Sequence, residues 1–132
     1  PAHAHHPPIP AIGCELYPAA LPELLVSLDE RYKLPPVYIT ENGAAMADVV
    51  QDGMVDDEDR IDYYTGHLNA VNEAMESGVK VGGYFAWSLM DNFEWAEGYE
   101  KRFGLVYVDF ETQERTFKNS AKAYQRLLAS RK

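Results

Sequence analysis

A glutamate at the end of an apolar run is the first residue of this chain that could do chemistry. Glu41 directly follows Val37–Thr40, a β-branched and aromatic run typical of a strand, and precedes an Asn-Gly pair typical of a tight turn. A carboxylate fixed at such a strand end can attack the electrophilic carbon of a sugar. A single glutamate in this position is more often merely exposed or salt-bridged, so the assignment depends on a second cluster of residues.

The second cluster lies at and beyond the end of another strand-like run, Val79–Leu89. Trp87, Glu94 and Trp95 share this segment with Asp91. An indole face packs against the C–H groups of a sugar, an indole N–H donates a hydrogen bond, and a carboxylate accepts bonds from two neighbouring hydroxyls. Tryptophans belong to protein cores more often than to ligand sites, but this combination favours a neutral ligand that is rich in hydroxyl groups.

Helices flank the two strand-like runs. Apolar residues recur at helical spacing over 21–32 and again from Ile61 to Met75. Between the first strand and the second helix, residues 44–59 are loop-like and end in the carboxylates of 56–59. We interpret these carboxylates as complementing the dipole of the second helix and keeping its start solvated, rather than as a cation site. That helix is expected to run to Ser77, with Gly78 as its left-handed cap.

The order strand, helix, strand predicts a parallel pair joined by a right-handed crossover. We expect the first strand, Val37–Thr40, to be buried on both faces, as strands of parallel sheets usually are. A hairpin is expected over 105–117, and Asn119 can cap a last helix. The inner face of this helix is expected to carry three residues: Tyr124, Leu127 and Leu128.

Two parallel strands leave both sheet edges open, so we expect the chain to be a piece of a larger sheet. In parallel sheets and in closed α/β barrels, ligands bind at the carboxyl ends of the strands. Glu41 and the segment Trp87–Trp95 both follow strand ends. We therefore expect both clusters to contribute to one site at that edge.

Composition and charge exclude several classes of partner. The 132 residues include 21 acidic and 12 basic side chains, a formal charge of −9 that repels phosphate backbones and anionic membranes, so neither partner is expected. Cys14 is the single cysteine, and no signal or membrane-spanning pattern is seen, so a cytoplasmic location is expected. Residues 1–11, rich in Pro and His, read as a linker or loop. Such a segment lacks the rigid placement of a metal site, and no cofactor is expected.

Longer motifs carry a resemblance. Three of them contain the two clusters: ITENG at 39–43, WSLMDNFEW at 87–95 and GYEKRFGLVYVD at 98–109. Three more occur in order around them: IGCELYP at 12–18, DRIDYYTGHLNAV at 59–71 and FKNSAKAY at 117–124. Together they resemble the carboxyl-terminal part of a family 1 glycoside hydrolase, the β-glucosidase group. The resemblance covers nearly the whole chain after its first ten residues.

The resemblance implies an α/β fold in which residues 12–132 are the carboxyl-terminal portion of a single (β/α)₈ TIM-barrel catalytic domain, with strands seven and eight and their flanking helices. The implied activity is that of a retaining β-glycosidase. It would hydrolyse terminal non-reducing β-D-glucosyl or related residues from β-glucosides or oligosaccharides.

The resemblance also implies a role for individual residues. Glu41 is similar to the catalytic nucleophile. Trp87 resembles the platform under the bound sugar, and the family has a non-proline cis peptide after this tryptophan. Glu94 resembles the residue that binds two sugar hydroxyls, and Trp95 an indole donor to a neighbouring hydroxyl. Phe103 resembles an apolar wall near the primary hydroxyl.

One part of the expected machinery has no counterpart in this sequence. Retaining hydrolysis needs two carboxyl groups about 5–5.5 Å apart, and the family's acid/base glutamate lies in an Asn-Glu-Pro motif that this chain lacks. A complete barrel needs roughly 250 residues. We therefore expect an N-terminal part of the same barrel to supply the acid/base glutamate, and the chain alone to be catalytically incompetent.

Two alternatives stay open at this point. A phosphorylated sugar is a competing substrate, because Lys101 falls where the phospho-glycosidase branch uses a lysine. A neutral sugar is favoured, since Glu94 would place a carboxylate against the phosphate. The alternative from another class is a non-catalytic carbohydrate-binding or assembly fragment, in which sugar binding would not depend on Glu41.

Overall fold

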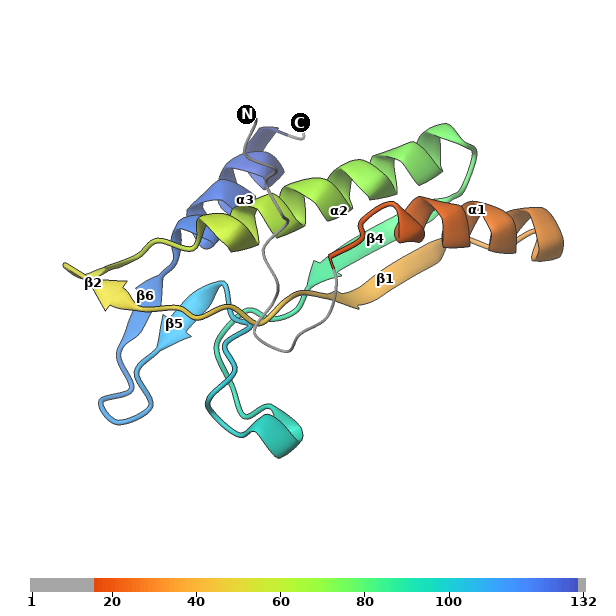
Figure 1. Cartoon of the computed structure of the whole chain (residues 1–132). Coiled ribbons are helices and arrows are strands. Elements are labelled where there is room, and N and C mark those ends of the chain that lie inside the picture. Colours follow the sequence, from red (N-terminus) through yellow and green to blue (C-terminus); the bar gives the residue numbers. More distant parts are fainter. Residues whose placement is uncertain (1–15, 131–132) are drawn as a thin grey trace, which may run out of the picture.

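The computed structural model describes residues 16–130, which form a two-stranded parallel sheet with helices on one face, followed by a hairpin and a third helix (Figure 1). The expected linker at 1–11, with its histidines, and Cys14 lie outside the described residues. Within residues 16–130, no helix combines the length and the apolar character needed to cross a membrane.

The sheet confirms the predicted parallel pair. Strand β1 (Val37–Asn42) pairs in parallel with β4 (Val81–Ala86), and helix α2 (Glu58–Glu76) lies between them in the chain. Both strands are shifted from their predicted bounds: β1 continues through Glu41 to Asn42, whereas β4 is shorter than the apolar run. Glu41 therefore belongs to the strand itself rather than to the turn after it.

Helices α1 (Ala20–Tyr32) and α2 pack on one face of this sheet (Figure 1). Their contact buries Leu25, Ala74 and Val79, against which Val37 and Val81 are partly buried. Helix α1 ends at Tyr32, where the predicted helical spacing also ends, and Lys33 then adopts the left-handed conformation with a φ of 52°.

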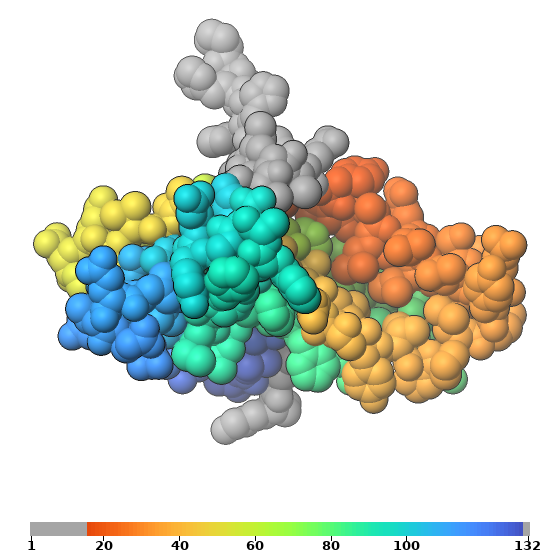
Figure 2. All heavy atoms as spheres, turned by 90° about the horizontal axis from the view of Figure 1, so that it is seen from below, coloured from red at the N-terminus to blue at the C-terminus, as the bar shows by residue number. Residues whose placement is uncertain are grey.

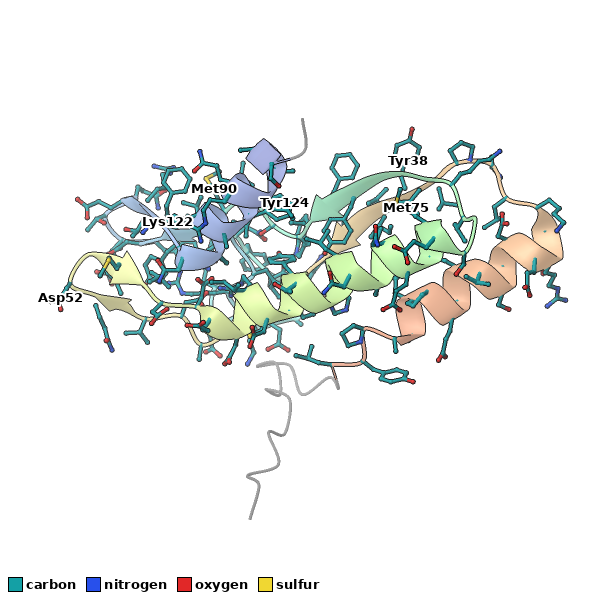
Figure 3. The ribbon with its side chains drawn as sticks, turned by 90° about the horizontal axis from the view of Figure 1, so that it is seen from above. Tyr38, Asp52, Met75, Met90, Lys122 and Tyr124 are labelled. Atoms are coloured by element: carbon teal, nitrogen blue, oxygen red, sulfur yellow. The ribbon has the colours of Figure 1, made fainter. Side chains whose placement is uncertain are left out.

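The opposite face of the sheet is exposed, so the expectation that the first strand is buried on both faces is wrong for this chain. Tyr38 is 59% exposed and Phe85 57%, and Figure 3 shows Tyr38 pointing away from α2. The ring of Tyr38 lies across Gly82, where an added Cβ would come within 2.6 Å of it. The apolar composition of β1 thus predicts a covering layer that the described residues do not include.

The prediction that residues 44–59 form only a loop is wrong, because this segment contains a short hairpin. Strand β2 (Val50–Gln51) pairs antiparallel with β3 (Met54–Val55). Asp52 and Gly53 form the turn with φ of 51° and 72° (Figure 3 labels Asp52). An Asp-Gly pair suits these positive φ angles, so the turn was readable from the sequence.

The interpretation of the acidic run at 56–59 as a solvated helix start is wrong for one of its members. Asp57 is 5% exposed and accepts hydrogen bonds from Arg60 at 2.6 Å and from the Ser120 amide at 2.8 Å. The other end of α2 largely matches the prediction: the helix stops at Glu76, one residue early, and Gly78 has a φ of 101°.

The hairpin and the last helix are present as predicted, but Asn119, which was expected to cap the helix, is its first residue instead. Strands β5 (Val106–Val108) and β6 (Arg115–Phe117) pair antiparallel, and α3 (Asn119–Ser130) follows. Tyr124 packs against a core cluster with Tyr64, but Leu128 is 54% exposed, so its assignment to the inner face is wrong. Leu128 instead lines an open apolar groove with residues of β5, β6 and the segment after β4.

Candidate active site

Glu41 and Trp87 lie at the carboxyl ends of two adjacent parallel strands. Asn42, the last residue of β1, is in register with Ala86, the last residue of β4. The Trp87 amide donates a hydrogen bond of 2.8 Å to the Asn42 carbonyl, which continues the pairing past the strand ends. The backbone of the two strands thus joins the segments that carry the two sequence clusters.

The turn after Glu41 is held from two sides. The Tyr84 hydroxyl donates to Asn42 Oδ1 at 2.6 Å, and the Tyr64 hydroxyl donates to the Trp87 carbonyl at 3.2 Å. At Gly43 an added Cβ would lie only 1.8 Å from the Trp87 carbonyl oxygen. The glycine of the Asn-Gly pair is therefore required by the close approach of Trp87 rather than by a positive φ.

The segment after β4 is folded back on residues 102–105. The peptide bond between Trp87 and Ser88 is cis, as the resemblance implies. The Ser88 amide donates to the Phe103 carbonyl at 3.1 Å, and the Leu105 amide donates to the Ser88 carbonyl at 2.8 Å. These two bonds place the backbone of Phe103 directly beside the Trp87–Ser88 peptide.

The structure also brings Trp87 and Glu94 together. The Trp87 indole Nε1 donates to Glu94 Oε1 at 3.0 Å. A carboxylate has about four acceptor positions, so this bond leaves Glu94 able to accept further hydrogen bonds. Trp95 begins the short 3₁₀ helix η1 (Trp95–Glu97), and its side chain is 87% exposed.

The loops form a continuous surface on one side of the molecule. Figure 2 shows the segment around residues 90–103, in teal to cyan, lying between the orange β1 region and the blue hairpin. The Glu41 side chain is exposed, and Phe103 and Glu94 are partly exposed. The roles of these residues, and of Trp87 and Trp95, stay predictions.

Beneath this surface lies a cluster of six charged side chains, which we call the charge network. It consists of three acids and three bases: Asp48, Asp57, Asp91, Arg60, Arg102 and Lys118. Five of the six side chains are no more than 1% exposed, and Arg102 is 16% exposed. The equal numbers of acids and bases make the network formally neutral, which is what burial of this many charges requires.

The Asp91 carboxylate is bonded to this network and to neighbouring backbone amides. Its Oδ1 accepts bonds from the Gly104 amide and from Lys118 Nζ, both at 2.9 Å, and its Oδ2 accepts from Arg102 at 2.6 Å. In the sequence, Asp91 is a neighbour of Glu94 and of the two tryptophans and is given no role of its own. The structure buries it, so among the two acids of that segment only Glu94 remains available to a sugar.

The pKa shifts follow from burial and from these pairings. Burial lowers the pKa of the Lys118 ammonium and the nearby Arg60 charge lowers it further, while Asp48 and Asp91 oppose both effects. Burial also lowers the pKa of Arg60, but Asp48 and Asp57 together hold it above its ordinary value.

Sequence reasoning missed the three cations of the charge network. A lysine or arginine at the end of a strand or in the first turn of a helix gives no local signal of burial, because its partners lie far away in the chain. Lys118 and Asp48, for example, are separated by 70 positions.

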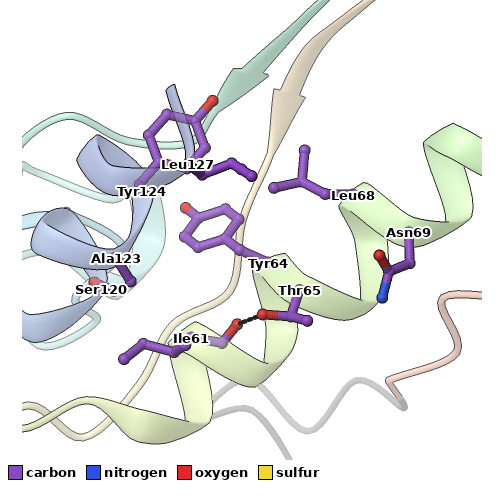
Figure 4. A pocket seen from close by; sticks show the side chains of 9 residues that line it. All are labelled: Ile61, Tyr64, Thr65, Leu68, Asn69, Ser120, Ala123, Tyr124 and Leu127. Carbon is purple, nitrogen blue, oxygen red and sulfur yellow. Dashed lines mark hydrogen bonds between the residues drawn. The ribbon is translucent and has the colours of Figure 1, made fainter. Parts of the chain in front are cut away.

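A cavity of about 150 Å³ lies elsewhere, between α2 and α3 (Figure 4). Tyr64, Leu68, Tyr124 and Leu127 contribute to its wall. These residues belong to helices rather than to strand ends, so we do not assign the site there. Among residues 16–130, no group of three or more His, Cys, Asp or Glu side chains is arranged to hold a metal ion.

Comparison with known proteins gives a consistent result. The model of glycosyl hydrolase family 1 matches residues 3–132. A β-glucosidase of an Agrobacterium species is 57% identical over 116 residues, which are 88% of this chain and 25% of that protein. β-Glucosidase A of Thermotoga maritima is 51% identical over 92% of this chain and 27% of its own length.

A 6-phospho-β-galactosidase of Streptococcus equi subsp. zooepidemicus is also similar, at 47% identity over 88% of this chain and 25% of that protein. The solved structure of the Thermotoga maritima family 1 β-glucosidase in complex with isofagomine lactam superposes with a TM-score of 0.90 and 50% identity. The superposition covers 92% of this chain and 28% of the Thermotoga maritima chain. The chain thus spans about a quarter of the length of the curated relatives it matches.

Proposed function

Because this chain belongs to glycosyl hydrolase family 1 and is part of a (β/α)₈ barrel, we propose that it contributes strands seven and eight to a retaining β-glucosidase. In this proposal β1 is strand seven and β4 is strand eight. Glu41 is the nucleophile, and a preceding part of the same barrel supplies the acid/base glutamate.

The observation that carries this proposal is the pairing at the strand ends. Glu41 lies one residue before Asn42, whose carbonyl accepts the Trp87 amide at 2.8 Å. A nucleophile and a sugar platform are thereby presented by neighbouring strands at the edge where barrel enzymes bind their substrates.

The chemistry follows in two steps. A Glu41 carboxylate oxygen attacks the anomeric carbon and forms a covalent bond to it, while the acid/base glutamate donates its proton to the leaving glycosidic oxygen. Water then attacks the same carbon, the acid/base carboxylate takes its proton, and Glu41 leaves as a carboxylate.

We propose that the remaining predicted residues hold the sugar. The indole face of Trp87 lies under the ring, and the indole N–H of Trp95 donates to a hydroxyl. Glu94, kept in place by the Trp87 indole at 3.0 Å, accepts from two sugar hydroxyls. Phe103 forms an apolar wall near the primary hydroxyl.

A neutral substrate suits this arrangement better than a phosphorylated one, although a phospho-β-galactosidase is among the similar proteins. The Glu94 carboxylate would face the phosphate as a like charge, which is costly away from bulk water. We therefore propose terminal non-reducing β-D-glucosyl or closely related residues as substrate.

The test uses a chimeric enzyme in which this chain replaces the matching part of the Thermotoga maritima β-glucosidase. The chimera is expected to hydrolyse an aryl β-glucoside, and Glu41→Gln to reduce kcat by several orders of magnitude. An active chimera that is unaffected by Glu41→Gln would refute the nucleophile assignment. Sugar binding without turnover would favour a non-catalytic carbohydrate-binding chain.

A further inference from the structure

Lys118 is a lysine whose side chain is fully buried. The side chain is 0% exposed, and the residue directly precedes α3. Its ammonium donates to Asp48 Oδ2 at 2.5 Å and to Asp91 Oδ1 at 2.9 Å. A single buried cation thus joins two carboxylates that belong to different loops.

These two loops are the ones that follow the two parallel strands. Asp48 lies in the loop after β1, the strand that contains Glu41. Asp91 lies between Trp87 and Glu94 in the segment after β4. Besides the backbone pairing at Asn42, the bridge through Lys118 therefore links the nucleophile segment to the sugar-binding segment a second time.

Asp91 passes this restraint on to a third segment. It accepts bonds from the Gly104 amide at 2.9 Å and from Arg102 at 2.6 Å, the residues on either side of Phe103. At Gly104 an added Cβ would lie 2.2 Å from the Asp91 amide nitrogen, so the two backbones cross in close contact. Asp91 therefore adds to the two backbone bonds of Ser88 in fixing the position of Phe103 relative to Trp87.

Stability alone is a weak reason for such an arrangement. Removing two charges from water costs about as much as their mutual attraction returns, so a buried ion pair is often no better than an apolar pair of the same size. The two directional bonds of the Lys118 ammonium do, however, fix the positions of the Asp48 and Asp91 carboxylates relative to each other. A misplacement of about 1 Å at a reacting centre can reduce a rate by roughly 100-fold.

We propose that Lys118 is a positioning residue, which through Asp48 and Asp91 holds the loop after Glu41 and the segment carrying Trp87 and Glu94 in the mutual arrangement needed for attack on the sugar. This inference rests on the proposed function. It does not make Lys118 a catalytic residue, because its ammonium is buried beneath the site and contacts carboxylates rather than substrate.

The test compares Lys118→Met with a matched control in the chimeric enzyme. Lys122→Met is the control, because Lys122 lies in the first turn of α3, four residues after Lys118, and is exposed (Figure 3 labels Lys122). A fluorinated glycoside that traps the nucleophile counts the competent sites, and kcat is expressed per trapped site. A purely structural role would reduce the number of sites, whereas a positioning role reduces the rate at each site.

For Lys118→Met we expect kcat per trapped site to fall by roughly 10- to 100-fold, with a much smaller change in KM, and we expect no change for Lys122→Met. An active parent whose Lys118→Met variant keeps its kcat per site would overturn the inference while leaving the proposed function intact. A parent chimera without turnover would overturn both.

A second variant covers the case in which Lys118→Met does not fold. Asp48→Asn keeps the shape of the side chain but removes one of the two charges that Lys118 contacts, which is also the carboxylate that Arg60 contacts with two bonds of 2.8 Å, and we expect it to reduce kcat per site in the same direction. Where both variants fold, the double variant should lose less than the product of the two single losses, because they break the same bridge. If the loss of kcat per site in the double variant equalled the product of the two single losses, the proposed bridge through Lys118 would be refuted.

Discussion

Adding one methyl group at Gly43 should disable the site without removing any functional side chain. A Cβ at Gly43 would lie 1.8 Å from the Trp87 carbonyl oxygen. Carbon and oxygen atoms in close contact lie about 3.3 Å apart, so Gly43→Ala forces a separation of about 1.5 Å between the two segments. The obstacle is backbone on both sides, so no flexible side chain can move away to accommodate the methyl group.

The displaced segments carry Glu41 on one side and Trp87 on the other. A shift of about 1 Å at a reacting centre costs roughly 100-fold in rate, so Gly43→Ala should reduce kcat/KM of the chimeric enzyme by about 100-fold. The crowding should also lower the free energy of unfolding by about 1–3 kcal/mol. The rate is measured on an aryl β-glucoside, and the free energy of unfolding by urea titration of the chimera.

Gly53→Ala provides the matched control. Gly53 has nothing within 4 Å of an added Cβ, and its φ of 72° disfavours any other residue. The same substitution there should cost about 1 kcal/mol of stability through backbone strain and leave kcat/KM unchanged. If Gly43→Ala retained kcat/KM within a few-fold of the parent, the close contact would not hold the site, and the reasoning from this geometry would be refuted.

Three further outcomes are expected. Asp57→Asn should lower the free energy of unfolding by about 3–5 kcal/mol in urea titration, because it leaves the buried Arg60 charge with one fewer partner, while Asp56→Asn, at an exposed carboxylate, should change it little. Burial raises the pKa of Tyr64 and Tyr84 above the ordinary value of 10.0, so the stability that these two tyrosines contribute is present below pH 10 and is lost as the pH rises beyond it. Phenolate absorbance of the two tyrosines should therefore appear only together with unfolding. Its appearance while the protein is still folded would contradict this expectation. Glu94→Gln should raise KM for the aryl glucoside by at least about tenfold, and an unchanged KM would remove Glu94 from the sugar site.

Much of the local structure could be predicted from the sequence. The parallel pair of β1 and β4 follows from two apolar runs separated by a segment with helical spacing, and the hairpin of β5 and β6 from an apolar run that is followed by a turn. In both cases the decisive signal is short in range. The β2–β3 hairpin was missed although its Asp52-Gly53 turn is such a signal, because its strands have only two residues each.

Burial was harder to predict than secondary structure. Tyr38 and Leu128 lie on apolar faces that a sequence pattern assigns to a core, but both are more than half exposed in this chain. Burial depends on which elements cover a face, and a periodic pattern shows only that a face is apolar. The exposed faces are consistent with a chain that spans about a quarter of the length of its relatives.

The sequence predicts which residues lie at the candidate site, but it does not predict the buried charge network beneath them. The strand-end positions of Glu41 and Trp87 follow from local patterns. The resemblance implies a sugar-binding role for Glu94, which stays a prediction, and the structure shows its contact with the Trp87 indole. The charge network beneath them depends on pairs such as Lys118 and Asp48, which are distant in the chain and carry no local signature. For the same reason no local pattern indicates that the oxygens of Asp91 are occupied by internal donors.

The covalent intermediate tests the central claim most directly. The chimeric enzyme is incubated with a 2-fluoro glucoside that forms the glycosyl-enzyme but hydrolyses slowly, and the digested protein is then examined by mass spectrometry. We predict that one peptide gains the mass of one fluorinated sugar and that fragmentation places this sugar on Glu41. A sugar on any other residue, or an active enzyme that acquires no covalent sugar, would contradict the account.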